Sequence, residues 1–450
     1  MNRPLLFKLG TIALLVVLLF IPLLMIDNLV SDRQYQRDRV VDDIARSSSF
    51  AQQLTGPVLV VPYTQAKRGW KTNKKTGERY WEEWQVRGRL YFLPEQFSLN
   101  GSMRTELRSR GIYQARLYHS DNRISGAFNL PANYDVSEKL EDYSFEQPFL
   151  AVGISDIRGI NNDLKLELNK QRLSFQPGSG EPILGSGVHV PLPALSVDKQ
   201  QTLNFAFDLK LQGTGSLHVT PIGRDSLVEL SSDWPHPSFS GLYLPTERSV
   251  SAQGFKAKWH TSFFATNMQE TLAGCRSGGE CRALMSRSMG VSFVDPVDHY
   301  LKAERSVKYA LLFITLTFAV FFLFEVLKRM AVHPMQYALV GLSLALFYLL
   351  LISLSEHIGF ALAYSVSATG CVALISFYVS YVLRSATRGI GFGLLLGMLY
   401  AMLYGLLSAE DYALLMGSIL VFAVLGCFMV LTRNLDWYGV GKSSVASAAK

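Results

Sequence analysis

Six stretches of the chain are apolar for long enough to cross a lipid bilayer. A membrane helix needs about 20 mostly apolar residues to span a hydrocarbon core of about 30 Å. Because backbone polar groups cannot stay unpaired in lipid, each stretch is predicted to be helical. The six stretches are Leu9 to Ile26, Tyr309 to Leu327, Met335 to Ser355, Ile358 to Leu383, Gly389 to Ala409 and Tyr412 to Thr432. The pattern therefore predicts a membrane protein with one helix near the start and five in the last third.

The charges that flank these stretches alternate in sign along the chain. Basic residues collect at the cytoplasmic ends of membrane helices. One set of ends carries Arg3, Lys8, Lys328, Arg329, Arg384, Arg388, Arg433, Lys442 and Lys450, and the other carries Asp27, Lys308, Glu356, Glu410 and Asp411. We therefore predict cytoplasmic termini, an N-terminal anchor over 1-30, a periplasmic domain over 31-306, five transmembrane helices over 307-433 and a cytoplasmic tail over 434-450.

The first apolar stretch is interpreted as an uncleaved signal anchor. A cleaved signal peptide has a shorter apolar region that ends at small residues, whereas this run ends at Met25, Ile26 and Asp27. The charged residues from Ser31 to Gln53 have apolar positions at helical spacing, so they are predicted to continue the helix outward. Gly56 and Pro57 are expected to stop it.

Beyond that point the apolar positions recur at every second residue, which is typical of half-buried strands. Alternation is clearest from Leu203 to Leu211 and from Phe255 to Trp259. Clusters of turn-forming residues separate such runs. The clusters are Lys74 to Gly77, Asn100 to Ser102, Pro177 to Gly180, Gly213 to Ser216 and Pro221 to Asp225. The fold class predicted is a membrane α + β protein: a signal-anchor helix, a large exported antiparallel β-rich domain and a C-terminal bundle of five transmembrane helices.

The formal net charge of +7 does not indicate a nucleic-acid-binding protein. Residues 31 to 305 hold 33 basic and 30 acidic residues, so only +3 of that excess belongs to the exported part. The orientation of the membrane helices explains the remainder. We expect the lipid bilayer as a partner and no nucleic acid.

The four cysteines divide between two environments. Cys371 and Cys427 fall within membrane stretches, where a thiol usually serves as a small apolar packing group. Cys275 and Cys281 belong to the exported part, and an oxidising compartment favours their pairing. A disulfide that closes this short loop is the preferred interpretation, with two free thiols as the alternative.

Catalytic patterns are weak in this sequence. The strings Ser196 to Lys199, Ser120 to Asn122 and Lys75 to Gly77 match the S-x-x-K, S-D-N and K-T-G motifs of penicillin-binding enzymes. Their order along the chain is reversed, and Ser196 precedes a strand rather than opening a helix. The exported histidines are scattered singly, without a zinc-binding spacing; they are His119, His189, His218, His236, His260 and His299. We predict no enzyme activity, catalytic residue, cofactor or metal site.

Ionisable residues near the membrane stretches are few, and each lies close to an end. Glu325 is expected to pair with Lys328 or Arg329, one turn away. Glu356 and His357 fall in a tight turn between two stretches, where water is expected to reach them, and His333 precedes another stretch. A proton relay needs ionisable groups at mid-membrane depth, so structural roles are favoured.

Several of these residues belong to longer motifs that resemble those of the CreD family of inner-membrane proteins. The resemblance extends from the first helix to Tyr438. It rests on His333, Pro334, Met335, Gln336 and Tyr337; Ser355, Glu356, His357, Gly359 and Phe360; Gly187 to Pro193; Trp234 to Phe239; and Thr432 to Tyr438. Cys275 and Cys281 are not part of this pattern.

The resemblance implies a cell-envelope integrity protein of Gram-negative bacteria, linked to a two-component regulon, envelope stress, and colicin and β-lactam tolerance. It implies no catalytic residue. Two hypotheses follow: a non-enzymatic envelope protein with periplasmic, cell-wall or inner-membrane protein partners, or a transporter or channel for a small neutral or lipidic molecule. The absence of charge deep in the membrane stretches favours the first. Ser179, in a glycine-rich loop, is expected to be exposed.

Overall fold

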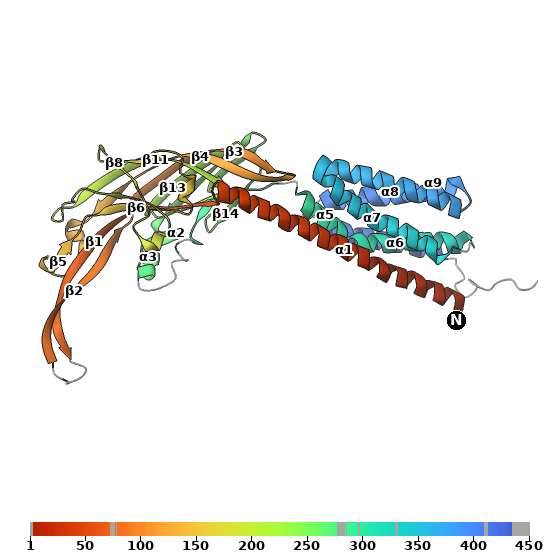
Figure 1. Ribbon diagram of the computed structural model, residues 1–450, viewed down its shortest axis with the longest axis horizontal. Coiled ribbons are helices and arrows are strands. Elements are labelled where there is room, and N and C mark those ends of the chain that lie inside the picture. Colours follow the sequence, from red (N-terminus) through yellow and green to blue (C-terminus); the bar gives the residue numbers. More distant parts are fainter. Residues whose placement is uncertain are drawn as a thin grey trace, which may run out of the picture. The chain divides into compact units, whose positions relative to one another are not determined.

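The computed structural model describes residues 3–72, 77, 79–276, 284, 286–295, 298–328, 332–408 and 413–433. The chain divides into two compact units, a helical unit of Met1–Asp38 with Val297–Lys450 and a β unit of Arg39–Pro296. Helix α1 (Arg3–Ser47) contributes residues to both (Figure 1). The predicted membrane α + β fold class, with an N-terminal apolar helix, a large β-rich domain and C-terminal apolar helices, is confirmed.

Each of the six predicted membrane stretches is helical over almost all of its described residues. After α1, the helical unit contains α5 (His299–Lys308), α6 (Ala310–Lys328), α7 (Pro334–Ile358), α8 (Phe360–Val382), α9 (Ala386–Ser408) and α10 (Ala413–Thr432). Within the described residues, α1, α7, α8 and α9 are each long and apolar enough to cross a bilayer. Helices α5 and α6, bent by 45° at their junction, form a fifth candidate, and the apolar part of α10, Leu415–Cys427, is shorter.

Aromatic side chains fill the interior of the helical unit. Phe318, Tyr337, Phe347 and Tyr400 are almost fully buried. Large apolar side chains on the outer helix surfaces are exposed, and Leu394 on α9 is 73% exposed. Such a surface is stable against lipid hydrocarbon and would be unfavourable in water.

The β unit contains two sheets. The first has the order β14-β17-β12-β1-β6-β10-β9, with β2 and β5 also paired to β1. Its strands are β1 (Gln52–Thr72), β2 (Arg79–Phe92), β5 (Tyr143–Phe145), β6 (Phe149–Ile154), β9 (Gln176–Pro177), β10 (Gly187–Pro191), β12 (Ser216–Thr220), β14 (Pro237–Gly241) and β17 (Met289–Phe293).

The second sheet has the order β15-β16-β13-β3-β4-β11-β7-β8. Its strands are β3 (Gln96–Arg110), β4 (Tyr113–Leu130), β7 (Lys165–Leu168), β8 (Gln171–Ser174), β11 (Gln201–Thr214), β13 (Asp225–Ser232), β15 (Glu247–Ser251) and β16 (Gly254–Ser262). Short helices α2 (Phe263–Thr266) and α3 (Met268–Arg276) follow β16.

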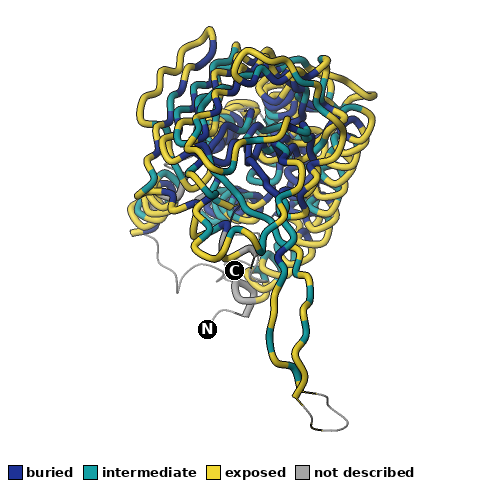
Figure 2. The backbone as a smooth tube through the Cα atoms, turned by 90° about the vertical axis from the view of Figure 1, so that its left-hand side faces the viewer, coloured by how far each residue is buried: buried dark blue, intermediate teal, exposed yellow. Residues whose placement is uncertain are grey.

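One hydrophobic core joins the two sheets. Leu59 and Leu150 from the first sheet cluster with Phe97, Phe128 and Phe207 from the second, and all five are buried. Figure 2 shows the buried segments gathered inside this layered body. The alternation predicted for Leu203 to Leu211 and Phe255 to Trp259 is confirmed, because these apolar side chains point into the core from β11 and β16.

The pairing is mixed rather than wholly antiparallel. β1 runs parallel to β12, and β13 runs parallel to β3, while the other described pairs are antiparallel. Parallel neighbours need long connections, and the partners here lie far apart in sequence, so alternation alone could not reveal them.

Three of the five predicted turn clusters are confirmed, among them Pro177 to Gly180, where the chain turns after β9 with positive φ at Gly178 and Gly180. One cluster is wrong, and Lys74 to Thr76 of the fifth lie outside the described residues. Gly213 to Ser216 joins β11 to β12, with Gly215 at a φ of +78°, and Pro221 to Asp225 joins β12 to β13. Asn100 to Ser102 instead lies within β3. A Cβ at Gly101 would lie 2.5 Å from Oδ1 of Asn122 and 2.9 Å from Cδ2 of Leu230. The glycine therefore permits close side-chain packing rather than a turn.

The boundary between α1 and β1 also differs from the prediction. The helix continues outward as predicted, but it ends at Ser47, before Gly56 and Pro57. These two residues lie inside β1, where the pairing with β6 shifts register between Thr55 and Val58. An irregularity of this kind accommodates a proline that cannot donate a ladder hydrogen bond.

Ser179 is buried, contrary to expectation. It is 4% exposed, and its hydroxyl donates to the carbonyl of Gly185 at 2.6 Å. The same oxygen accepts a hydrogen bond of 3.3 Å from the N–H of Glu181. The glycine-rich loop is therefore folded back on this hydroxyl.

Candidate functional site

The first polar cluster of the helical unit surrounds Glu325 near the end of α6. We call Lys8, Glu325, Val332 and Tyr337 the Glu325 cluster. Oε2 of Glu325 accepts a hydrogen bond of 2.9 Å from the Tyr337 hydroxyl, and Oε1 accepts one of 3.0 Å from the N–H of Val332. Lys8 from α1 forms an ion pair with the same carboxylate, which is 5% exposed. A buried carboxylate requires such partners, so the cluster joins α1, α6 and α7.

The structure describes an ionic partner of Glu325 that the sequence did not indicate. We expected Lys328 or Arg329, whereas the described partner is Lys8, 317 residues away in the sequence. The side chains of Lys328 and Arg329 lie outside the described structure. The pairing with Lys328 or Arg329 therefore stays a prediction, while Lys8 reaches Glu325 because helix α1 packs beside this end of α6.

The motif that begins at His333 starts helix α7. His333 is the N-cap residue, and its Nδ1 accepts a hydrogen bond of 3.2 Å from the N–H of Met335. The side chain of Gln336 accepts one of 3.0 Å from the N–H of His333, which completes a capping box. Pro334 occupies the first turn, where its missing N–H costs no hydrogen bond. His333, Pro334 and Gln336 are thus placed to define a helix start.

A second polar cluster lies at the other end of α7. We call Arg33, Arg37, Asp298, Tyr300 and Glu356 the Glu356 cluster. Glu356 Oε1 accepts a hydrogen bond of 3.0 Å from the Tyr300 hydroxyl and lies 3.7 Å from Nε of Arg33. Asp298 caps the start of α5 and accepts a hydrogen bond of 2.6 Å from Arg37. Helices α1, α5 and α7 are therefore held together at this end.

The two neighbours in the predicted turn behave differently. His357 is exposed at the end of α7, just before Gly359 turns the chain into α8. The Glu356 side chain is only 9% exposed, because α1 and α5 cover it. The expectation that water reaches both residues is therefore wrong for Glu356. Asp298 and Tyr300 were not anticipated, although an aspartate one residue before a helical pattern is a recognisable N-cap.

The spacing of the clusters matches a bilayer. A rise of 1.5 Å per residue places Tyr337 and Glu356 about 29 Å apart along α7, and a hydrocarbon core is about 30 Å thick. The ionised groups of these clusters thus lie near the two ends of the helices. This arrangement suits ion pairs and hydrogen bonds between helices rather than a proton relay across the membrane.

Neutral polar groups form a short chain deeper in the bundle. The Tyr364 hydroxyl donates to the carbonyl of Tyr400 at 2.7 Å, and the Tyr400 hydroxyl lies 3.4 Å from Sγ of Cys371. That thiol in turn lies 3.5 Å from the carbonyl of Ser343. These contacts satisfy polar groups within α7, α8 and α9.

The cysteine predictions can be followed only in part. Cys371 is buried and Cys427 is exposed, and both are free thiols within helices. The predicted disulfide between Cys275 and Cys281 lies outside what the structure describes, since the side chain of Cys275 and all of Cys281 are excluded from it. That pairing stays a prediction.

The structure separates the two described strings that resemble penicillin-binding motifs. Ser196 and Lys199 lie in the irregular segment that leads into β11, with no helix. Ser120 and Asn122 lie in β4, where Ser120 pairs with Leu211 and the amide of Asn122 donates to the Ser120 hydroxyl at 2.8 Å. Gln201, the first residue of β11, is about 30 Å from Leu211 at 3.3 Å per residue. Ser196 and Ser120 therefore do not meet in one site, and Lys75 and Thr76 of the third string lie outside the described residues.

Three histidines of the β unit each contact an acidic or hydroxyl side chain. His119 lies 3.0 Å from Glu106, whose pKa is lowered by hydrogen bonds from His119 and Arg108. His260 lies 2.7 Å from Asp225, and His218 lies 2.9 Å from the Ser240 hydroxyl. Among the described residues, no group of three His, Cys, Asp or Glu side chains could hold a metal ion.

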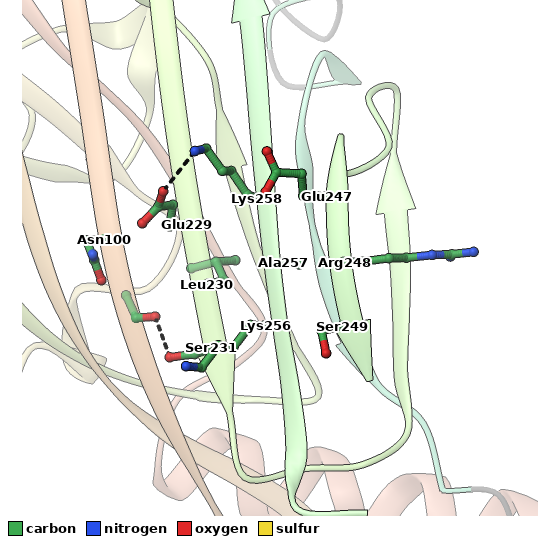
Figure 3. Close-up of a pocket in the computed structure, with 11 residues that line it drawn as sticks. Asn100, Glu229, Leu230, Ser231, Glu247, Arg248, Ser249, Lys256, Ala257 and Lys258 are labelled. Carbon is green, nitrogen blue, oxygen red and sulfur yellow. Dashed lines mark hydrogen bonds and ion pairs between the residues drawn. The ribbon is translucent and has the colours of Figure 1, made fainter. Parts of the chain in front are cut away.

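A shallow depression crosses the outer face of the second sheet (Figure 3). It has a volume of about 450 Å³ and lies over β3, β13, β15 and β16. Lys258 and Glu229 form an ion pair of 3.5 Å in it, and the Ser231 hydroxyl donates to the carbonyl of Gly101 at 3.4 Å. Figure 3 shows Glu247 close to Lys258 and Arg248 directed away. The opposite charges of these groups balance one another, as is usual on a solvent-exposed face of a sheet.

The fold and its polar clusters define a membrane protein of the α + β class, with apolar helices and one large β domain. The family model described as "Inner membrane protein CreD" matches residues 4–438. The chain therefore belongs to the CreD family of inner-membrane proteins. The inner membrane protein CreD of Escherichia coli (strain K12) is 38% identical over 444 residues, which cover 97% of this chain and 95% of that protein.

Two solved structures show distant likenesses to this chain. An M1 zinc metallopeptidase from Deinococcus radiodurans aligns over 38% of this chain and 39% of its own, at 10% identity and a TM-score of 0.18. Yeast LTA4 hydrolase aligns over 50% of this chain and 35% of its own, at 12% identity and a TM-score of 0.20.

Proposed function

We propose that this protein is a non-enzymatic, multi-pass inner-membrane protein that supports cell envelope integrity and the response to envelope stress. In this proposal both termini are cytoplasmic and residues 31-306 are periplasmic, where the β domain contacts periplasmic, cell-wall or inner-membrane protein partners. The resemblance to the CreD family suggests a link to a two-component regulon and to colicin and β-lactam tolerance.

The observation that carries the proposal is the use of the buried carboxylates. Glu325 and Glu356 are engaged by partners from α1, α5 and α7, at opposite ends of the bundle. Carboxylates that are held in ion pairs and hydrogen bonds between helices are unsuited to carry protons or bind a charged solute. The helical unit then acts as a stable support for the β domain.

Complementation in cells tests this proposal. A strain that lacks the gene is complemented with the wild-type chain, with Ser196→Ala/Lys199→Ala and with His119→Ala. We expect all three to restore colicin and β-lactam tolerance equally, because in this proposal none of the substituted side chains takes part in catalysis. Loss of complementation by a well-expressed variant would contradict a non-enzymatic role. Crosslinking from the β domain, followed by mass spectrometry, would identify its partners.

A transporter or channel for a lipidic molecule is the second candidate. A cavity of about 460 Å³ lies between α6, α9 and α10, and its lining is almost wholly apolar, with Val320, Leu396 and Leu420 among its walls. An acyl chain needs no charged group for binding, so such a cavity favours this function over transport of ions.

A pair of bulky substitutions separates the two functions. Leu396→Trp fills the cavity, whereas Leu394→Trp adds the same volume on the exposed face of α9. If the protein is a support, both variants should complement when equally abundant. Failure of Leu396→Trp alone, at normal abundance and thermal stability in detergent, would favour the transporter.

A further inference from the structure

The β1–β2 hairpin extends beyond the rest of the β domain. The two strands pair from Leu59 with Phe92 to Thr72 with Arg79. Strand β5 covers β1 only at Tyr63 to Gln65, and no other described strand pairs with the hairpin past that point. Residues 66–72 and 79–85 are therefore a two-stranded projection, which we call the arm. Figures 1 and 2 both show it leaving the body of the domain.

Contacts between the two strands hold the arm in shape. A two-stranded ribbon is marginally stable in water by itself. Trp70 and Trp81 are directly opposite and meet edge to face at 5.5 Å. Lys71 forms an ion pair of 2.8 Å with Glu82 and lies 4.4 Å from the centre of the Trp84 ring. Cross-strand pairs of this kind stabilise a hairpin, so the arm has a defined surface.

That surface exposes large aromatic side chains. Trp70 is 67% exposed, Trp81 57% and Tyr80 46%. Stabilisation of the hairpin explains why the two indole rings contact each other edge to face. It does not explain why most of each ring is exposed to water. Exposed tryptophan and tyrosine at a projecting tip mark a surface that contacts another phase or molecule.

The aromatic residues face both sides of the arm. Successive residues of a strand point to opposite faces. Trp81 shares one face with its partner Trp70, so Tyr80 lies on the other, opposite Lys71. A protein partner would contact mainly one face, whereas an arm that is inserted among lipid headgroups exposes both faces to the same environment.

The charges of the arm complement an anionic surface. The arm holds four basic residues, Lys67, Arg68, Lys71 and Arg79, and two acidic residues, Glu82 and Glu83. Both acidic residues are already paired, Glu82 with Lys71 and Glu83 with Arg68. Lys67 and Arg79 are exposed and form no ion pair with any described residue. Two cations are thus left beside the exposed rings.

We propose that the arm docks on an anionic lipid surface, with Trp70, Tyr80 and Trp81 inserted at the headgroup level and Lys67 and Arg79 facing the lipid phosphates. Tryptophan and tyrosine favour the membrane–water interface, and basic residues are attracted to anionic headgroups. This inference names a lipid partner for the β domain, and it rests on the proposed function only in placing that domain outside the cytoplasm.

Vesicle binding by the full chain tests the proposal. The protein is reconstituted in nanodiscs of phosphatidylcholine and mixed with vesicles that contain phosphatidylglycerol, and bound protein is recovered by flotation. We expect Trp70→Ser/Tyr80→Ser/Trp81→Ser to weaken binding by about tenfold or more. Leu242→Ser/Leu244→Ser/Val250→Ser, which removes three exposed apolar side chains elsewhere on the β domain, should leave binding unchanged.

The charge contribution is measured with a matched pair. Lys67→Gln/Arg79→Gln should weaken binding by about fivefold per cation removed, and high salt should abolish this difference. Arg248→Gln/Lys256→Gln, on the outer face of the second sheet, should bind as the wild type does. Equal binding of wild type to vesicles of phosphatidylcholine alone would overturn the proposed role of the cations.

A second measurement needs no substitution in the arm. Brominated lipids in the target vesicles should quench part of the tryptophan emission of the wild-type protein, because Trp70 and Trp81 reach the bromine atoms. No binding of the wild type, unchanged binding of the aromatic triple variant, or arm-dependent capture of cell-wall sacculi without vesicle binding would each overturn the inference. Complementation is scored separately, so failure of the lipid contact and failure of the envelope role are distinguishable.

Discussion

The hydroxyl of Tyr300 donates a hydrogen bond of 3.0 Å to the carboxylate of Glu356, which joins the start of α5 to the end of α7. The backbone N–H of the same tyrosine donates to Asp298, and Asp298 accepts from Arg37 of α1. One residue thus belongs both to a helix cap and to an interhelical contact. Removal of the Tyr300 hydroxyl is therefore expected to weaken the contact between α5 and α7 at this end of the bundle.

Tyr300→Phe should lower the free energy of unfolding by about 1.5 kcal/mol, because a hydrogen bond to a mostly buried carboxylate is lost. Thermal unfolding of the purified protein in detergent measures the effect. Tyr309→Phe is the matched control, since its hydroxyl forms no hydrogen bond with any described side chain or backbone group. Equal melting temperatures for wild type and Tyr300→Phe would contradict the assigned contact.

Lys8→Met should destabilise the helical unit by about 3 kcal/mol, because it leaves the Glu325 carboxylate buried without its cation. Glu325→Gln removes the charge and keeps one side-chain oxygen that can accept from the N–H of Val332, while its NH2 group can donate to the Tyr337 hydroxyl oxygen. The double variant Lys8→Met/Glu325→Gln should therefore be more stable than the sum of the single effects predicts. Additive losses in a double-mutant cycle would show that the two side chains do not interact.

The predicted topology can be tested with single cysteines in a chain whose native cysteines are replaced. Ser249 on β15 is exposed and suits this purpose, whereas Ser179 is buried and does not. An impermeant maleimide should label Ser249→Cys in intact spheroplasts and Ser444→Cys only after lysis. Ser444 lies outside the described residues. Labelling of Ser444→Cys before lysis would reverse the orientation inferred from the basic flanks.

Asp156 should make stability depend on pH. Hydrogen bonds from Arg158, with a further one from the N–H of Phe50, hold the pKa of Asp156 below its ordinary value. The unfolded carboxyl titrates near pH 3.9, so this contribution is complete above that value and is lost as pH falls through the lower folded pKa.

Wild type should therefore be more stable than Asp156→Asn at neutral pH, and the difference should shrink below about pH 4. Denaturant unfolding of the β domain within the full chain, followed by near-ultraviolet circular dichroism, measures it. Asp163→Asn removes a carboxylate that is 77% exposed and should show no such trend. A difference that grows on acidification would contradict the sign.

Ser196→Ala and Lys199→Ala should change neither stability nor phenotype by a measurable amount. An acylating serine needs its lysine one helical turn away, and this segment contains no helix. The purified protein should not be labelled by a fluorescent penicillin. Covalent labelling that disappears in Ser196→Ala would overturn this prediction.

The local patterns of the sequence predicted the elements well, since burial follows periodicity directly. Leu203 to Leu211 alternate into the core of β11, and the apolar stretches became helices. The parallel pairing of β1 with β12 was beyond such reasoning, because nothing local to Gln52 indicates Leu217 as its neighbour. Long-range pairing depends on the whole core rather than on one segment.

The polar clusters were predicted only as single residues. His333, Gln336 and Glu356 were recognised from a motif, but Arg33, which lies 3.7 Å from Glu356, was not. Glu325 was assigned to a neighbour one turn away, because local ion pairs are the default expectation on a helix. Lys8 could not be identified from sequence, since tertiary packing alone brings α1 beside α6.

Helix α1 also sets an order of events during synthesis. Its charged side chains Lys8, Arg33 and Arg37 emerge from the ribosome hundreds of residues before Glu325, Glu356 and Asp298. At 5 to 20 residues per second, the 317 residues between Lys8 and Glu325 take roughly 15 to 60 s to translate. During that interval Lys8 lacks its counter-ion. The ion pairs that join α1 to α5, α6 and α7 can therefore form only late in synthesis, and a chain truncated before α6 lacks the partner of Lys8.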